Sequence, residues 1–79
     1  MDSFEALILS AEDQKDSDRL LTLLDQNGRV FKVYASHARS AKSRMAALTE
    51  PFVYGRFEVK QNASGFILRD VEAKEGFMG

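Results

Sequence analysis

Five short runs of apolar and β-favouring residues, turn signals between them and one long connection after the third run together predict an all-β fold. We expect a five-stranded OB-type Greek-key barrel with a short helical turn in the connection between strands 3 and 4. Closing the sheet would remove the exposed edges that an open five-stranded sheet leaves. The chain has 79 residues, so we expect a single domain over residues 1–79, with the ordered barrel over about residues 4–73.

The first two predicted strands occupy residues 4–11 and 18–24. The first carries apolar side chains on both faces, as in a barrel strand whose outer side is covered. The second is rich in leucine and is also compatible with a helix capped by Ser17. Its seven residues are few for a helix, and Asn27-Gly28 beyond it is a strong hairpin signal. We therefore predict a strand that turns back into a third strand.

The third strand is predicted over residues 29–35, and residues 36–50 follow without a strand pattern. This connection is long for a compact domain, and connections of that length are usually functional or disordered. Residues 46–48 would close it with a helical turn, which Pro51 would stop.

The fourth and fifth strands are predicted over residues 52–60 and 66–73, with a turn at residues 62–65 between them. Side chains of the fourth run alternate between two faces, which is the period of a strand. Gly55 interrupts this run, and a glycine inside a strand indicates a bulge or a sharp bend. A small barrel needs such bends.

The composition excludes several classes of site. The chain has no cysteine, so it holds no disulfide, no thiolate metal site and no cysteine nucleophile. Its single histidine, His37, cannot build a zinc site without other strong ligands. The sequence has no nucleophile elbow and no paired-carboxylate pattern, so we expect no enzymatic activity and no cofactor. We see no signal peptide and no membrane-spanning stretch, and we expect a cytoplasmic protein without membrane contact.

Charge is unevenly distributed along the chain, although the net charge is only −1. Residues 1–25 contain seven acidic and two basic residues, whereas residues 26–49 contain five basic residues and no acidic one. Residues 50–79 contain five acidic and four basic residues. Local charge steers a polyanion more than the net charge does. The middle segment is therefore where we expect nucleic acid to bind.

This basic segment also contains aromatic residues, and single-stranded nucleic acid needs that combination, because cations follow the phosphates while flat rings stack on bases. Phe31 and Tyr34 have opposite strand parity. We expect Phe31 to point inward with Val33 and Ala35, and Tyr34 to lie outside beside Lys32. The candidate nucleic-acid-binding residues are Arg29, Lys32, Tyr34, Arg39, Lys42 and Arg44. We expect the basic members of this set to lie along a single flank of the barrel.

A plainer interpretation stays open at this point. A basic run without acidic residues is often a solvated loop, and aromatic residues more often pack in a core than stack on bases. Asp16 and Asp18 lack the full ligand spacing of a metal site. We expect these aspartates to hold the geometry of their loop or to pair with Arg19.

Several short motifs occur in an order and spacing that resemble a known family. They are Ala6-Leu7-Ile8-Leu9, Asp16-Ser17-Asp18-Arg19-Leu20-Leu21-Thr22-Leu23-Leu24, Gly28-Arg29-Val30, Ala38-Arg39-Ser40-Ala41-Lys42-Ser43-Arg44 and Ala47-Leu48-Thr49-Glu50-Pro51-Phe52. Over about residues 4–73 the chain resembles the N-terminal OB domain of the bacterial DNA repair protein RecO. Typical RecO chains continue into a helical domain, often with a cysteine zinc site, and carry a glycine about where this chain has Ser36-His37.

The resemblance implies an OB fold that binds single-stranded and double-stranded DNA without sequence preference and that can promote strand annealing. It implies a RecR-like protein and single-strand-binding protein as partners. The positions that match the family's basic region are Arg39, Lys42 and Arg44 in the loop, with Arg29 and Lys32 on the preceding strand. The basic loop of this chain is less dense than is usual in the family, so we expect weaker DNA binding than in a complete RecO.

The alternative function is a protein-docking OB module in a repair or replication complex, without direct DNA contact. OB barrels also bind proteins, and a fold alone does not determine a function. Under this alternative the acidic segment 12–18 or a strand edge would hold the partner.

Overall fold

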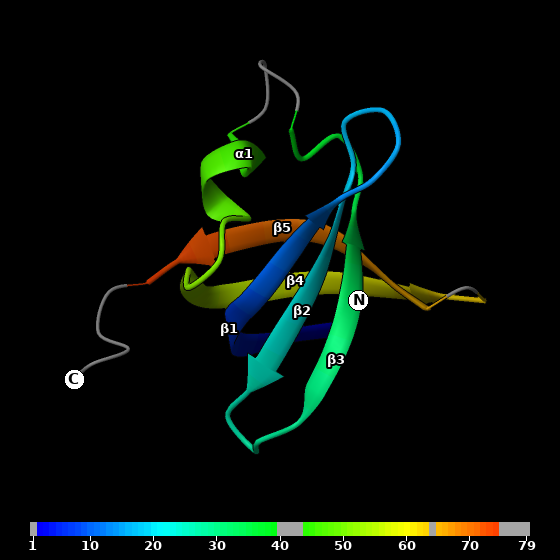
Figure 1. The fold of residues 1–79 in the computed structure, drawn as a ribbon. Helices are drawn as coiled ribbons and strands as arrows, with labels where there is room; N and C mark the ends of the chain where they lie inside the picture. Colours follow the sequence, from blue (N-terminus) through cyan, green and yellow to red (C-terminus); the bar gives the residue numbers. More distant parts are fainter. Residues whose placement is uncertain (1, 40–43, 64, 75–79) are drawn as a thin grey trace.

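The computed structural model describes residues 2–39, 44–63 and 65–74, and these form a closed barrel with the strand order β1-β2-β3-β5-β4. The elements are β1 (Asp2–Asp13), β2 (Arg19–Asp25), β3 (Val30–Ala35), α1 (Met45–Leu48), β4 (Tyr54–Asn62) and β5 (Gly65–Ala73). The predicted five-stranded barrel is confirmed, as is the short helical turn between the third and fourth strands. In Figure 1, β1, β2 and β3 lie side by side, and β4 and β5 cross behind them at a steep angle.

Closure of the barrel depends on β1 and on one short parallel contact. The N-terminal half of β1 pairs antiparallel with β4, and its C-terminal half pairs antiparallel with β2. On the other side, β3 and β5 meet in parallel at the pairs Val33–Phe66 and Tyr34–Ile67. This contact brings the outer surface of β3 next to the start of β5, which lies about thirty residues later in the sequence.

The leucine-rich run forms the strand β2, as predicted. Leu21 and Leu23 are fully buried, whereas Leu20 and Leu24 are half-buried on the outer side. This alternation has the period of a strand, and it places two leucines in the core and leaves two on the surface.

The core consists of the inward-facing residues of all the strands. Val33 and Ala35 are buried as predicted, and Phe31 is half-buried and packs against the same core. Tyr34 lies on the outer side, also as predicted. The buried apolar residues are Ala6, Ile8, Leu21, Leu23, Val33, Ala35, Ala38, Phe57, Val59, Leu68 and Val71.

The hairpin between β2 and β3 turns at Asn27-Gly28, as predicted, but its loop has three residues. Asp25 and Arg29 close the loop, since the Asp25 amide donates to the Arg29 carbonyl at 2.9 Å. Of Asn27 and Gly28 only the glycine has a positive φ, 82°. A type I turn followed by a left-handed glycine is a common three-residue hairpin.

Gly55 does not mark a bulge. The pairing of β4 with β1 and with β5 passes Gly55 without a shift in register. The register shifts instead between Ile8 and Ser10 of β1 and between Glu58 and Val59 of β4. A Cβ at Gly55 would lie 2.3 Å from the Glu72 carbonyl oxygen, so the glycine allows a close approach between the backbones of β4 and β5.

The start of the fourth strand differs from the prediction, because β4 begins at Tyr54 and Phe52 belongs to a turn. The Val53 amide donates to the Glu50 carbonyl at 3.3 Å, and Phe52 has a φ of 72°. With Pro51 at the second position and a left-handed residue at the third, this is the pattern of a type II turn. Pro51 therefore starts a turn where the sequence pattern indicated a strand.

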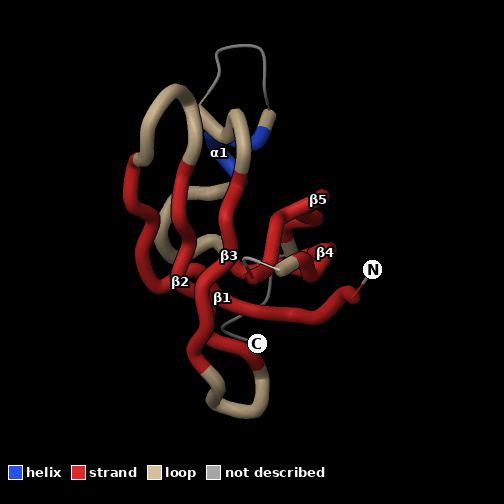
Figure 2. The backbone as a smooth tube through the Cα atoms, turned by 90° about the vertical axis from the view of Figure 1, so that its right-hand side faces the viewer, coloured by secondary structure: helices blue, strands red, loops and turns tan. Residues whose placement is uncertain are grey.

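The helix α1 ends at Leu48, before Pro51, as predicted. Thr49 closes it, because both its amide and its hydroxyl donate to the Met45 carbonyl, at 3.0 and 2.7 Å. The helix packs against β5. Within the described residues, no helix has the length and apolar character that crossing a membrane requires. Figure 2 shows the helix and the β2–β3 turn at opposite ends of the barrel.

Candidate nucleic-acid interface

A groove of about 400 Å³ runs along the outer surface between β3 and the turn that joins β4 to β5. Its lining combines a cation, aromatic rings, an amide and aliphatic side chains. The lining residues are Leu20, Lys32, Tyr34, Asn62, Gly65, Phe66 and Ile67. Two of the predicted DNA-binding residues, Lys32 and Tyr34, therefore lie in one groove.

The strand register explains why these side chains meet. Leu20 of β2 pairs with Tyr34 of β3, and Tyr34 pairs with Ile67 of β5. Directly paired residues point to the same face of a sheet, so these three side chains form a row across the outer surface. Lys32 lies two residues before Tyr34 and shares its face. Asn62 at the end of β4 and Gly65 at the start of β5 lie at the edge of this row.

Tyr34 is held in place by an acceptor outside the groove. Its hydroxyl donates to Asp18 Oδ2 at 2.5 Å, and the other carboxylate oxygen accepts the His37 amide at 2.8 Å. The bond from Tyr34, followed by that from His37, lowers the pKa of Asp18 below its ordinary value of 3.8. The same bond raises the pKa of Tyr34. A ring fixed in this way loses little freedom when a base stacks on it.

We predict an acid-dependent contribution of Asp18 to stability. Because its pKa is lowered on folding, the ionised group stabilises the fold above pH 3.8, and this contribution is lost as the pH falls through the folded pKa. Tyr34→Phe removes the hydrogen bond from the Tyr34 hydroxyl, which is the main cause of the lowered pKa of Asp18. We expect wild type to have the higher melting temperature at pH 7, with the difference shrinking below about pH 3.8. Thermal unfolding followed by circular dichroism from pH 2 to 7 measures this.

The comparison of the two proteins at each pH removes the contributions of other acids. Hydrogen bonds from Lys74 and Tyr54 also lower the pKa of Glu5, but these contacts are present both in the wild type and in Tyr34→Phe. A difference in melting temperature that stayed constant down to pH 2 would contradict the assigned role of Asp18.

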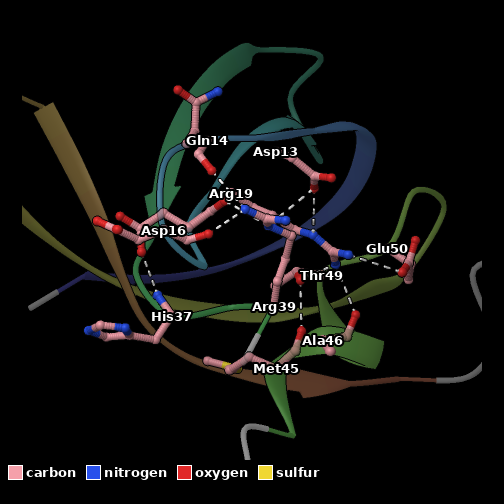
Figure 3. A network of polar contacts seen from close by, with 11 residues as sticks. Asp13, Gln14, Asp16, Arg19, His37, Arg39, Met45, Ala46, Thr49 and Glu50 are labelled. Carbon is pink, nitrogen blue, oxygen red and sulfur yellow. Dashed lines mark hydrogen bonds and ion pairs between the residues drawn. The ribbon is translucent and has the colours of Figure 1, made fainter. Parts of the chain in front are cut away.

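Arg39 is bound within the protein rather than extended into solvent. Its Nη2 donates to the carbonyls of Gln14 and Asp16 at 2.8 and 2.6 Å, and its Nε donates to the Asp18 carbonyl at 3.4 Å. An ion pair with Asp13 at 3.6 Å adds to these bonds. Figure 3 shows this guanidinium beside the β1–β2 loop. Arg39 thus fastens the loop of residues 14–18 to the segment that follows β3.

Arg19 makes a second set of contacts close to the first. Its Nη1 donates to the Ala46 carbonyl at 3.0 Å and to Thr49 Oγ1 at 2.9 Å, which ties α1 to β2 (Figure 3). It pairs with Asp13 and Glu50, each at 3.4 Å. Asp18 holds loop geometry, as predicted, while the acidic partners of Arg19 are these other two residues.

The backbone at His37 has a φ of 58°, a conformation that favours glycine. The resemblance to RecO placed a glycine at about this position. This chain accepts a histidine there, with its amide bound to Asp18.

Of the predicted site residues that the structure describes, Arg29, Arg39 and Arg44 do not line the groove that holds Lys32 and Tyr34. Arg29 directly precedes β3, at the opposite end of that strand from Arg39. Arg44 is exposed and pairs with Asp70 of β5 at 2.7 Å. Lys42 lies outside the described residues. The expected single basic flank is therefore divided, although the role of each residue in DNA binding stays a prediction.

The sequence reasoning missed Leu20, Asn62, Gly65, Phe66 and Ile67 as part of this surface. The turn signal at residues 62–65 was visible in the sequence. Its position beside Tyr34 was not, because it follows from the parallel contact between β3 and β5.

Comparison with known proteins places these observations in a family context. The family model described as "Recombination protein O N terminal" matches residues 1–77. A "DNA repair protein RecO" from Myxococcus xanthus is 35% identical over 66 residues, which are 84% of this chain and 27% of that protein. Another from Bacillus velezensis is 34% identical over 61 residues, covering 77% of this chain and 24% of that protein. The chain thus spans about a quarter of the length of these relatives.

Proposed function

The chain belongs to the family of RecO N-terminal domains, and from that premise we propose that its barrel is the DNA-binding module of a recombinational repair protein. The module would bind single-stranded DNA in the β3 groove, and duplex DNA through the same basic side chains, without sequence preference. Strand annealing and contacts with a RecR-like protein and single-strand-binding protein would belong to the whole repair protein, of which this barrel is one part.

One observation carries this proposal: Lys32 and Tyr34 share a groove with Phe66 and Asn62. OB folds bind oligonucleotides over strands 2 and 3 and beside the loop between strands 4 and 5. The groove lies on that surface. It offers a cation for a phosphate and rings for stacking, which together suffice for binding without sequence readout.

Few phosphates would be contacted, so affinity should be modest and salt-dependent. Lys32 lies in the groove and Arg29 lies farther along β3 toward its turn. Two phosphate contacts on a single strand give a slope of about −1.4 in log K against log salt.

We predict that Lys32→Ala weakens binding of all single-stranded oligonucleotides alike, by about fivefold at low salt, since one exposed ion pair contributes up to about 1 kcal/mol. The salt slope should become shallower by about 0.7. Fluorescence anisotropy with a labelled oligonucleotide, titrated at several salt concentrations, measures both quantities.

Lys15→Ala is the matched control, because Lys15 is an exposed lysine on the β1–β2 loop and its loss changes the net charge equally. Equal effects of the two substitutions would show that only overall charge matters and would remove the groove from the proposal. Absence of binding by the wild type even at low salt would favour a protein-docking module.

A further inference from the structure

The end of the barrel next to the β2–β3 turn opens into a cavity of about 560 Å³. Three phenylalanine rings form its wall. The centroid of the Phe31 ring lies 5.0 Å from that of Phe4 and 5.8 Å from that of Phe66. We call this cavity the mouth of the barrel. The residues that line it are Asp2, Phe4, Asp25, Arg29, Val30, Phe31, Val59 and Phe66. The opposite end of the barrel is the one that carries α1.

This mouth of the barrel is more accessible than the core behind it. Phe57, which stacks on Phe4 from inside, is fully buried, whereas Phe4, Phe31 and Phe66 are only half-buried. Val30 at the rim is 59% exposed. Aromatic surface in an open cavity of this volume is suited to a flat apolar ligand.

The mouth adjoins the β3 groove. Phe66 lines both cavities, and it is the shared wall between them. Along β3, Phe31 faces the mouth and its neighbour Lys32 faces the groove. A strand of nucleic acid that follows β3 would pass from Tyr34 over Phe66 to Arg29.

We propose that the mouth of the barrel binds a single unstacked nucleobase of the DNA strand that occupies the β3 groove. This inference rests on the proposed function of the groove and adds to it a second site. The base stacks against the phenylalanine rings, and Arg29 at the rim contacts the adjoining phosphate. Aromatic platforms beside cations are the usual means by which single strands are held.

The charges at the mouth favour some bases over others. Asp2 and Asp25 line the cavity together with Arg29, and carboxylates repel phosphate but accept hydrogen bonds from N–H groups. Asp25 Oδ1 already accepts the amides of Asn27 and Arg29, which fixes that carboxylate at the turn. Cytosine presents an amino group where thymine presents a carbonyl oxygen. The mouth should therefore prefer cytosine to thymine.

The test introduces an ammonium group at the rim with Val30→Lys, a position exposed enough to accept it without loss of the fold. The lysine would pair with the carboxylates that line the mouth and would donate to a thymine carbonyl oxygen, so it opposes the preference for cytosine. Labelled oligo(dC) and oligo(dT) of about 15 nucleotides are titrated by fluorescence anisotropy at one salt concentration. Wild type should bind oligo(dC) about fivefold more tightly than oligo(dT), and Val30→Lys should abolish most of this preference. The ratio of the two affinities is the quantity that tests the proposal, because attraction of the added charge to phosphate acts on both oligonucleotides alike.

Ala47→Lys is the matched control, since it adds the same charge at an exposed position on α1, away from the mouth. It should leave the ratio unchanged. An unchanged ratio in Val30→Lys, or no preference in wild type, would overturn base binding at the mouth. If Lys32→Ala still weakened binding in that case, the groove would stand and the mouth would be open to an apolar peptide instead. If wild type bound neither oligonucleotide, both proposals would fail.

Discussion

Gly55→Ala should destabilise the barrel by about 3 kcal/mol, because the added Cβ would meet backbone atoms that cannot move aside. It would lie 2.3 Å from the Glu72 carbonyl oxygen and 2.9 Å from the Ala73 Cα. Gly55 is buried in β4 and pairs with Ala6 on one side and Ala73 on the other. A domain of this size has a total stability of about 5 kcal/mol, so most of it would be lost.

Thermal or urea unfolding followed by circular dichroism measures this effect, and we expect the melting temperature to fall by about 15 °C. Gly28→Ala is the control, because a Cβ there meets no atom within 4 Å and is opposed only by the φ of 82°. That substitution should cost about 1 kcal/mol. Similar losses in the two variants would contradict a backbone clash at Gly55.

Arg39→Ala should destabilise the fold by about 2 kcal/mol, because it removes a charged donor from three backbone carbonyls. Those carbonyls belong to Gln14, Asp16 and Asp18, and the Arg39 side chain is 32% exposed. We expect a melting temperature about 10 °C lower, measured by the same unfolding experiment.

Two further variants separate the role of the guanidinium's hydrogen bonds from that of its positive charge. Arg39→Lys keeps the charge but lacks the planar fork that reaches several acceptors, so it should recover little of the lost stability. Arg44→Ala removes an exposed arginine with a single ion pair to Asp70, and it should change stability by less than about 0.5 kcal/mol. Full stability in Arg39→Lys would show that charge alone accounts for the role of Arg39.

The strands were predictable because their signals are local. Alternation placed Val33 and Ala35 inward and Tyr34 on the opposite face. Asn27-Gly28 marked a hairpin and Pro51 limited α1, since both act through the backbone dihedrals of their own residues. The start of β4 was the exception, because Pro51 followed by Phe52 forms a turn with a residue type that rarely occupies that position.

The candidate site was predictable only in part. Lys32 and Tyr34 were chosen because charge and aromatic character follow from residue type, and strand parity gave their face. Phe66 could not be added from the sequence, because it reaches β3 only through the parallel contact that closes the barrel. Likewise, nothing local distinguishes Arg39, which binds the β1–β2 loop, from an arginine directed to solvent.

By itself, the sequence determined the strands, their order along the chain, the faces of their side chains and the family to which the barrel belongs. The tertiary structure decided which basic residues are engaged within the protein, which ones face a groove, and that three phenylalanine rings open at one end of the barrel. The physical reason is that strand formation depends on neighbours a few residues apart. The groove and the mouth depend on the closure between β3 and β5, whose paired residues lie far apart in the chain.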